Sequence, residues 1–197
     1  MTAIRLQQIT DLSHHFACPF LKAGDRVVDA TAGNGKDTLF LAEKVGPSGL
    51  VYAFDIQKEA LKGTEQVLKE AGLAGWVRCI CDGHEKMIDY IEGPVNAVIY
   101  NLGYLPGGNH KVTTTRETTG KSLKQAFALL EPGGVVMIVL YPGHPAGKEE
   151  KEMLLSLCRS LDPAQFSSVH LHLLNKTGIP PELIAVQKNH LKREYFN

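Results

Sequence analysis

Several absences limit what this protein of 197 residues can do. It has no excess charge of either sign, because Lys plus Arg and Asp plus Glu each number 21. Broad, non-specific nucleic-acid binding needs a general basic field, so the composition argues against it but leaves room for a local basic patch. No apolar run reaches membrane-spanning length, and the N-terminus lacks a signal peptide's basic and apolar regions. We therefore expect a cytoplasmic protein that does not enter a membrane.

Cysteine is scarce and poorly spaced for metal binding. The four cysteines are Cys18, Cys79, Cys81 and Cys158, and no two of them form a CxxC pair. Cys79 and Cys81 lie on one face of an expected strand, which is a poor geometry for chelating a metal without other ligands. We expect reduced, mostly packing cysteines and no metal site.

The third glycine of the dinucleotide-binding fingerprint is also missing. Residues 27–38 begin as an apolar strand, pass through Gly33 and Gly35, and resume as a helical pattern. This order forms the first half of a nucleotide-binding crossover, in which glycines let the backbone approach the ligand. Thr38 stands where the dinucleotide pattern has its third glycine. A nicotinamide cofactor is therefore disfavoured.

Acidic residues at two strand ends indicate a different cofactor. Asp29 lies on the first strand, where a carboxylate can hold a cationic amino group. S-adenosylmethionine offers such a group, and a nicotinamide dinucleotide does not. Asp55 ends the second strand, where a carboxylate accepts hydrogen bonds from both ribose hydroxyls of an adenosine. The glycine-rich turn with these two acids predicts an S-adenosylmethionine site.

The order of the expected elements is that of an α/β protein with one domain, residues 1–197, that starts with a helix at about 1–20. Strands are expected at 26–30, 50–55, 76–81, 95–100, 135–140, 166–175 and 183–189, and helices at 4–17, 36–45, 57–71, from 119 or 122 to 130, and 148–161. Residues 131–134 are expected to form a tight turn. The last connection between strands is too short for a helical crossover, so the final pair should be antiparallel. The prediction is a Rossmann-like, doubly wound, mostly parallel seven-stranded sheet with a C-terminal antiparallel hairpin.

Polar residues follow the expected strands, at the edge where such sheets bind ligands. Asp82 follows the third strand and is either a contact to an adenine amino group or a helix N-cap. Asn101 follows the most apolar strand, and the alternative to a functional role is a turn asparagine. The loop from Tyr141 to His144 follows the fifth strand. His14 and His15 end the first helix, which is usual for dipole-complementing surface residues, and the alternative is a place in the pocket.

Three motifs together resemble a known family. They are Asp-Ala-Thr-Ala-Gly-Asn-Gly-Lys-Asp-Thr, Tyr-Asn-Leu-Gly-Tyr-Leu-Pro-Gly-Gly and Tyr-Pro-Gly-His-Pro-Ala-Gly. Most of the chain resembles the class I S-adenosylmethionine-dependent methyltransferases. More narrowly, it is similar to a small bacterial family long called rRNA methylases, which is associated with methylating the aminomethyl group of the tRNA wobble uridine. The resemblance implies a product of 5-methylaminomethyl-uridine, often also 2-thiolated, and the tRNA anticodon loop as substrate.

The resemblance also implies roles for matching positions. The methionine part of the cofactor would be held by the loop containing Asp29, Thr31, Ala32, Gly33, Asn34 and Gly35, which Asp37 and Thr38 would help to close. Asp55 and Gln57 would hold the ribose, Ile56 would lie beside the adenine, and Asp82, Gly83 and His84 would lie at the adenine end. Asn101 and Tyr104 match the first and last residues of the Asn-Pro-Pro-Tyr motif of amino-group methyltransferases. Leu102 and Gly103 replace its two prolines.

The chemistry of such a reaction favours an asparagine beside the acceptor. A nitrogen nucleophile needs a free lone pair, and an amine with a pKa near that of Lys, ~10.4, costs about 4–5 kcal/mol to deprotonate at pH 7. An amide such as that of Asn101 orients the amine without favouring its cation, as a carboxylate would. His144 or Tyr141 is then available to carry the proton away. The sequence does not choose between them.

Other readings remain open at this stage. They are a methyltransferase acting on rRNA, DNA or a small amine, a nicotinamide-dependent oxidoreductase, and a non-catalytic RNA-binding module. Both a monomer and a homodimer are compatible with the sequence. Basic residues that are candidates for gripping an anticodon loop are Lys111, Arg116, Lys121, Lys188, Lys192 and Arg193.

Overall fold

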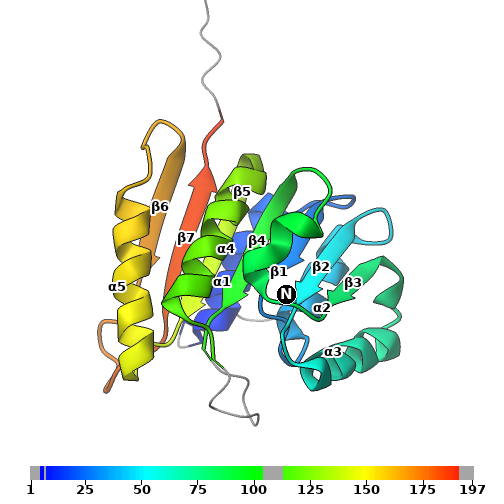
Figure 1. The fold of residues 1–197 in the computed structure, drawn as a ribbon, viewed down its shortest axis with the longest axis horizontal. Coiled ribbons are helices and arrows are strands. Elements are labelled where there is room, and N and C mark those ends of the chain that lie inside the picture. Colours follow the sequence, from blue (N-terminus) through cyan, green and yellow to red (C-terminus); the bar gives the residue numbers. More distant parts are fainter. Residues whose placement is uncertain (1–4, 7, 104–112, 191–197) are drawn as a thin grey trace, which may run out of the picture.

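The computed structural model describes residues 5–6, 8–103 and 113–190 (Figure 1). The strands are β1 (Arg26–Asp29), β2 (Leu50–Phe54), β3 (Val77–Ile80), β4 (Val95–Asn101), β5 (Leu130–Leu140), β6 (Phe166–Leu171) and β7 (Glu182–Lys188). The α-helices are α1 (Ile9–Ala17), α2 (Lys36–Val45), α3 (Lys58–Glu70), α4 (Arg116–Leu129) and α5 (Pro145–Arg159). Short 3₁₀ segments are η1 (Cys18–Phe20), η2 (Ala74–Trp76) and η3 (His84–Asp89).

The seven strands form one mixed sheet in the order β3-β2-β1-β4-β5-β7-β6. The first five strands run parallel, β7 pairs antiparallel with β5, and β6 pairs antiparallel with β7. Strand order reverses between β1 and β4, which places a topological switch point at their carboxyl ends. The predicted doubly wound sheet with a closing antiparallel hairpin is confirmed.

Successive side chains of the central strands pack alternately into two separate cores, one on each face of the sheet. In β4, Val98 and Tyr100 pack into one core, whereas Ala97 and Ile99 pack into the other. This is the two-residue repeat of a strand, and an apolar residue at every position is what burial on both faces requires. Val95–Tyr100 is accordingly apolar at every position except Asn96, and its other five side chains are buried.

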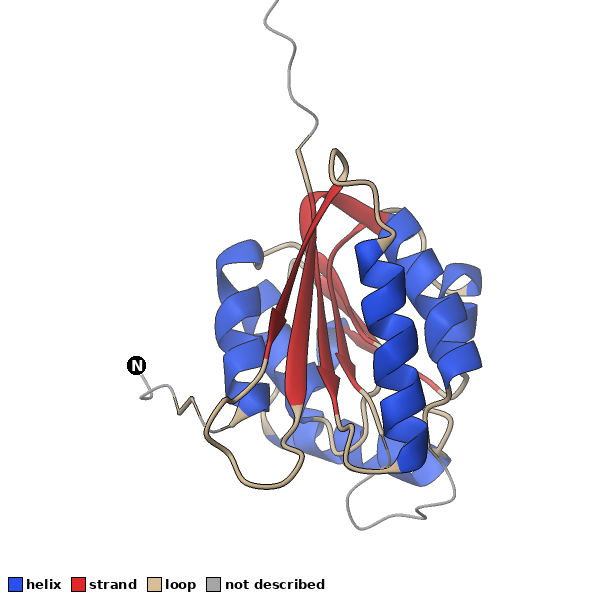
Figure 2. Ribbon diagram, turned by 90° about the vertical axis from the view of Figure 1, so that its left-hand side faces the viewer, coloured by secondary structure: helices blue, strands red, loops and turns tan. Residues whose placement is uncertain are grey.

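Helices cover both faces of the sheet (Figure 2). Buried side chains of α4, α5 and η3 pack into one core, and those of α1, α2 and α3 pack into the other. The N-terminal helix α1 lies against β5 and β7 (Figure 1). Its last turn reaches the start of α2, where His14 contacts Asp37. The chain thus brings a helix that precedes β1 to the edge where the strands end.

Five elements have boundaries that differ from the sequence-based predictions. Helix α1 begins at Ile9, β6 ends at Leu171, and residues 131–134 lie within β5, where they bulge between the pairs Val95–Leu130 and Ala97–Val135. Helices α4 and α5 begin earlier than expected because the side chains of Thr115 and His144 cap them. Neither cap was recognised in the sequence.

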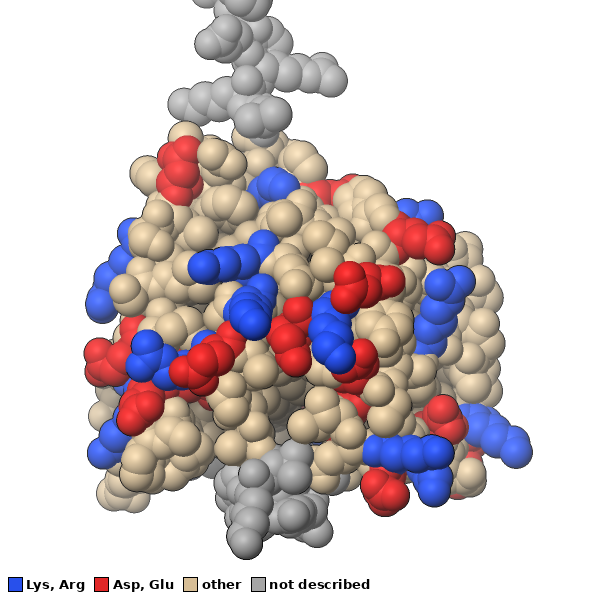
Figure 3. Space-filling view, viewed as in Figure 1, with Lys and Arg blue, Asp and Glu red and all other residues tan. Residues whose placement is uncertain are grey.

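Charges of both signs are interspersed on the face that carries α4 and α5 (Figure 3). Of the helices in the described parts of the chain, none is long and apolar enough to cross a membrane. The same residues contain no cluster of three or more His, Cys, Asp or Glu that would hold a metal ion.

Candidate active site

The loop after β1 is organised around the fully buried carboxylate of Asp29. Its two oxygens accept a hydrogen bond of 2.5 Å from the Thr38 hydroxyl and one of 3.1 Å from the Thr31 backbone N–H. Burial, followed by the nearby charge of Asp37, raises the pKa of Asp29 to about 7. Asp29 therefore ties the start of α2 to the end of β1. Both of its oxygens are engaged within the protein.

Two glycines shape the same loop. Gly35 precedes α2 with φ +77°, and a Cβ there would lie 3.0 Å from the Thr64 Cα of α3. The Thr64 hydroxyl donates to the Gly33 carbonyl over 3.1 Å. Only glycine fits a left-handed backbone position pressed this closely against a helix. No side chain of the described residues caps the N-terminus of α2, so the backbone N–H groups at this end of the helix can face a negative ligand group.

Asp55 connects the ends of β1 and β2. Its carboxylate accepts from the Gly33 N–H over 2.9 Å and from the Gln57 N–H over 2.8 Å. Each oxygen uses one lone pair in this way, so each can still accept a hydroxyl donor. Ile56 beside it is 58% exposed and offers an apolar surface that a flat group could cover.

Asp82 and His84, which follow β3, have different environments. Asp82 accepts hydrogen bonds from Lys86, Tyr90 and the Gly83 N–H, and the first of these contributes most to lowering its pKa to about 2. Gly83, and not Asp82, occupies the N-cap position of η3, so the N-cap alternative for Asp82 is wrong. His84 donates from Nδ1 to the Ala30 carbonyl over 3.1 Å, and burial lowers its pKa. A neutral His84 leaves a lone pair on Nε2, which is buried and has no partner among the described residues.

Asn101 ends β4 at the centre of this edge. Its backbone N–H donates to the Thr31 hydroxyl over 2.7 Å, and its side-chain Nδ2 lies 3.4 Å from Asp37 Oδ2. The other Asp37 oxygen lies 2.6 Å from His14 Nε2. The His14 ring stacks on Phe40 with centroids 3.9 Å apart. The first helix thus supplies a residue that contacts the site.

The loop after β5 brings Tyr141 and His144 to the same edge. Tyr141 is 37% exposed, and its pKa is raised by partial burial and then by the charge of Asp37. His144 caps α5, because its Nδ1 accepts the Gly147 N–H over 3.1 Å. Its Nε2 is buried without a partner among the described residues. Tyr141 therefore lies near enough to Asp37 to be affected by its charge, whereas the His144 side chain caps α5.

A buried glutamate that was not predicted from the sequence is linked by hydrogen bonds to the segment just after Asn101. Glu150 of α5 is 5% exposed and accepts from the hydroxyls of Thr119 and Thr114 over 2.7 and 3.2 Å. Thr114 in turn accepts the Gly103 N–H over 3.0 Å, just after Asn101. Burial raises the pKa of Glu150. In the sequence it lies in a run of charged residues, so nothing there distinguishes it from a surface position.

The remaining predicted residues are Tyr104 and the basic candidates for gripping RNA. Tyr104, Lys111, Lys192 and Arg193 lie outside the described residues. Lys188 is not available to grip RNA, because its Nζ donates to the carbonyls of Leu130 and Phe127 over 2.7 and 3.4 Å. Arg116 and Lys121 of α4 are exposed.

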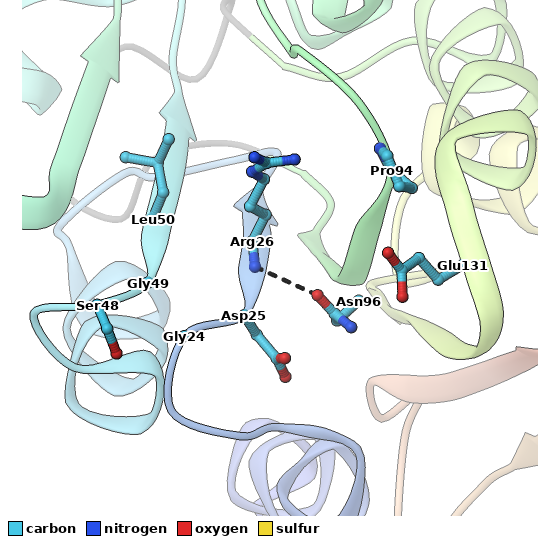
Figure 4. A pocket seen from close by; sticks show the side chains of 9 residues that line it. All are labelled: Gly24, Asp25, Arg26, Ser48, Gly49, Leu50, Pro94, Asn96 and Glu131. Carbon is cyan, nitrogen blue, oxygen red and sulfur yellow. Dashed lines mark hydrogen bonds between the residues drawn. The ribbon is translucent and has the colours of Figure 1, made fainter.

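A separate polar hollow of about 360 Å³ lies at the opposite edge of the sheet (Figure 4). It is lined by Asp25, Arg26, Asn96 and Glu131, among others, and Arg26 donates its backbone N–H to Asn96 over 3.2 Å. These residues start the strands, whereas the motif residues end them. Since ligands of open α/β sheets bind at the carboxyl ends, this hollow is not the candidate active site.

Comparisons with known proteins define the class. Residues 51–187 match the family described as "Putative rRNA methylase". The chain is 36% identical over 186 residues to a chloroplastic tRNA (mnm(5)s(2)U34)-methyltransferase of Arabidopsis thaliana, a match that spans 88% of this chain and 67% of the relative.

Solved structures agree with this match. A structure described as a "putative rRNA-methylase" from Clostridium thermocellum has 42% identity and a TM-score of 0.91, covering 93% of this chain and 99% of the other. A methyltransferase structure from Streptococcus mutans in complex with SAH has 34% identity and a TM-score of 0.84, with the same coverage.

The chain belongs to this rRNA methylase family. It is a methyltransferase of the S-adenosylmethionine-dependent class. The loop after β1 fits such a cofactor, since no side chain of the described residues caps the start of α2 and its backbone N–H groups can face a carboxylate.

Proposed function

We propose that the protein methylates the nitrogen of the 5-aminomethyl group on uridine or 2-thiouridine at the tRNA wobble position, giving 5-methylaminomethyl-(2-thio)uridine. The observation that carries the proposal is the Asn101 side chain. It is an amide at the end of the central strand, between the loop after β1 and the Asp37 carboxylate. The 36% identity to a tRNA methyltransferase of that named specificity supports the choice of acceptor.

The cofactor would lie along the carboxyl ends of β1, β2 and β3. In the proposal the loop residues Thr31, Ala32, Gly33, Asn34 and Gly35 hold its methionine part, and Asp29 and Thr38 fix the shape of that loop. Asp55 and Gln57 hold the ribose. Ile56, Gly83 and His84 border the adenine, and the free Nε2 lone pair of His84 suits an N–H donor. Asp82 lies at the same end, already bonded to Lys86 and Tyr90.

The acceptor would lie against Asn101. S-adenosylmethionine supplies a methyl group on a positively charged sulfur, so the protein's main task is to place the nucleophile in line with it. The Asn101 backbone is fixed by Thr31, which also belongs to the cofactor loop. One hydrogen bond thereby sets the acceptor residue relative to the proposed cofactor residues. Tyr104 matches the amino-methyltransferase motif and remains a predicted acceptor contact. Tyr141 and His144 are the alternative groups predicted to carry the proton away.

The proposed RNA substrate is the anticodon loop of a tRNA. The molecule has no net charge, so binding would rest on a local set of cations such as Arg116 and Lys121. We expect a modest salt dependence, corresponding to only a few phosphate contacts. Affinity that does not change between low and physiological salt would remove the physical basis of an RNA substrate.

The substrate assignment is tested by offering different acceptors with labelled S-adenosylmethionine. These are tRNA that carries 5-aminomethyl-uridine at the wobble position, the same tRNA as an unmodified transcript, and rRNA. Label should enter only the first, and mass analysis of its nucleosides should place one added methyl on the wobble nucleoside. Labelling of rRNA in preference to tRNA would favour the rRNA alternative that the family's description suggests.

A further inference from the structure

The proposed reaction needs a group that takes a proton from the acceptor. An alkylamine is largely an ammonium at neutral pH, and it becomes a nucleophile only after losing that proton. A suitable group needs a free lone pair and a place within reach of the acceptor beside Asn101. Among the titratable side chains at this edge of the sheet, four are candidates. They are Asp29, Asp37, Tyr141 and His144.

Three of the four are poorly suited. A neutral His144 has one ring lone pair, and the Nδ1 that carries it accepts the Gly147 N–H at the start of α5. Asp29 is fully buried, and its oxygens accept from Thr38 and Thr31 inside the loop after β1, so a substrate amine does not reach it. Tyr141 faces the negative charge of Asp37, which opposes formation of a phenolate.

Asp37 satisfies both requirements. Its Oδ2 lies 3.4 Å from Asn101 Nδ2, the group proposed to orient the acceptor. Its side chain is 9% exposed, and its Oδ1 is held 2.6 Å from His14 Nε2. The charged or titratable groups that face it are His14 from α1, Asp29 from β1 and Tyr141 from the loop after β5. Of these, only His14 can provide a positive charge or an N–H donor that favours the carboxylate.

We propose that Asp37 is the catalytic proton acceptor and that His14 is the positioning residue that holds the Asp37 carboxyl group in place. The inference rests on the proposed function and adds the proton path to it. The acceptor ammonium gives one N–H proton to Asp37 Oδ2. The freed nitrogen lone pair then forms the N–C bond while the C–S bond of the cofactor breaks and its electron pair stays on sulfur. His14 is 25% exposed, so the proton can leave Asp37 toward solvent on this side.

A competing role for Asp37 is to hold the ammonium of the cofactor's own methionine part. The two roles differ in what the variant Asp37→Asn loses. If Asp37 contacts the cofactor, Asp37→Asn should lower the affinity for S-adenosylhomocysteine, measured by calorimetry without any RNA. If Asp37 is the proton acceptor, the variant should instead lower the methyl-transfer rate and change its dependence on pH.

The test is single-turnover methyl transfer to tRNA bearing 5-aminomethyl-uridine, between pH 6.5 and pH 9.5. Asp37→Asn should be slower than wild type by about 10²–10⁴-fold near neutral pH. Its rate should then rise by about tenfold per pH unit, since it follows the fraction of free amine. The wild-type rate should rise less steeply. Affinity for S-adenosylhomocysteine should change less than threefold.

His14 is tested by two substitutions and a control on the same helix. His14→Phe should slow transfer and steepen the pH dependence, whereas His14→Gln, which keeps an N–H donor, should recover most of the rate. His15→Gln changes the exposed neighbour and should behave as wild type. The imidazole signals of His14, followed by NMR in the protein without RNA, should shift in Asp37→Asn, while those of His15 should not.

Several results would overturn the inference. They are a pH–rate profile of Asp37→Asn that runs parallel to wild type, a defect explained wholly by cofactor affinity, and equal rates for His14→Phe and His14→Gln. Failure of the wild-type protein to methylate this tRNA would overturn the proposed function and the inference with it. Active wild type with a normal Asp37→Asn would overturn the inference alone.

Discussion

The backbone N–H of Asn101 and the hydroxyl of Thr31 are 2.7 Å apart, and they join the last residue of β4 to the loop after β1. These two strands are neighbours at the topological switch point of the sheet. Asn101 is the residue proposed to orient the substrate amine, and Thr31 is part of the loop proposed to hold the cofactor. Their hydrogen bond therefore joins the residue proposed to orient the amine to the loop proposed to hold the cofactor.

Replacing Thr31 by Val keeps its shape and removes this acceptor. The Asn101 N–H is then left partly buried and unpaired, which should lower the free energy of unfolding by about 1–3 kcal/mol. Methyl-transfer rate should also fall, because the acceptor residue is less firmly placed. Urea denaturation and single-turnover kinetics measure the two effects. Thr31→Ser restores the hydroxyl and is the matched control, so equal loss in both variants would contradict the assignment.

Asp29 should make stability depend on pH. Its pKa is about 7 in the folded protein, against about 4 in an unfolded chain, so the folded state binds the proton more tightly. Between these values the folded state holds more protons, so the stabilising contribution is present below about pH 4 and is lost as pH rises toward 7.

Urea denaturation of wild type and Asp29→Asn between pH 4.5 and pH 7.5 isolates this contribution. The free energy of unfolding of wild type should fall relative to that of the variant by a few kcal/mol across the range. The Thr38 hydroxyl can accept from an amide as well as donate, so the variant keeps a partner. A difference between the two proteins that does not vary with pH would contradict a raised pKa.

Asp55 is expected to bind the ribose of the cofactor. Asp55→Ala removes the two acceptor oxygens and should weaken S-adenosylhomocysteine binding by about 1.5–3 kcal/mol for each charge-assisted hydrogen bond lost. Some of that loss comes through the backbone N–H groups of Gly33 and Gln57, which also bind this carboxylate. Asp55→Asn keeps one acceptor oxygen, so its affinity for S-adenosylhomocysteine should lie between those of wild type and Asp55→Ala. Unchanged affinity of Asp55→Ala by calorimetry would remove Asp55 from the cofactor site.

Glu150 is expected to support the segment after Asn101. Glu150→Ala leaves the hydroxyls of Thr114 and Thr119 without their shared acceptor and should lower the free energy of unfolding by about 1–3 kcal/mol. Glu150→Gln should cost less, because an amide oxygen still accepts. Glu149→Ala changes the exposed neighbour on the same helix and should be nearly neutral. Similar losses in Glu149→Ala and Glu150→Ala would show that the buried network contributes little.

The sequence predicted the sheet, and the strand ends that carry the candidate site, because both depend on local patterns. Val95–Tyr100 is apolar at all positions but one, which identifies a strand buried on both faces, and Asn101 interrupts that run. Asp29 and Asp55 were found in the same way, as acids that end or follow strands. Where a strand is recognised, its carboxyl end is recognised as well.

Contacts between distant elements were not predictable in this way. His14 precedes β1, and no local pattern shows that α1 packs against β5 and β7 and brings His14 to Asp37. Glu150 can be buried because Thr119 of α4 and Thr114, just before α4, donate hydroxyl hydrogen bonds to its carboxylate. The early starts of α4 and α5 follow from caps by Thr115 and His144, and histidine is not among the usual capping residues.

The most direct test of the account is to replace Asn101 and measure cofactor binding and methyl transfer separately. Asn101→Ala should bind S-adenosylmethionine nearly as tightly as wild type but transfer the methyl group on the order of a hundredfold more slowly, because the amine is no longer held in line. Asn101→Asp should also be slow, since a second carboxylate beside Asp37 favours the protonated amine, and raising the pH should recover part of its rate. Full activity of Asn101→Ala on tRNA with wobble 5-aminomethyl-uridine, or a loss due wholly to weaker cofactor binding, would contradict the account.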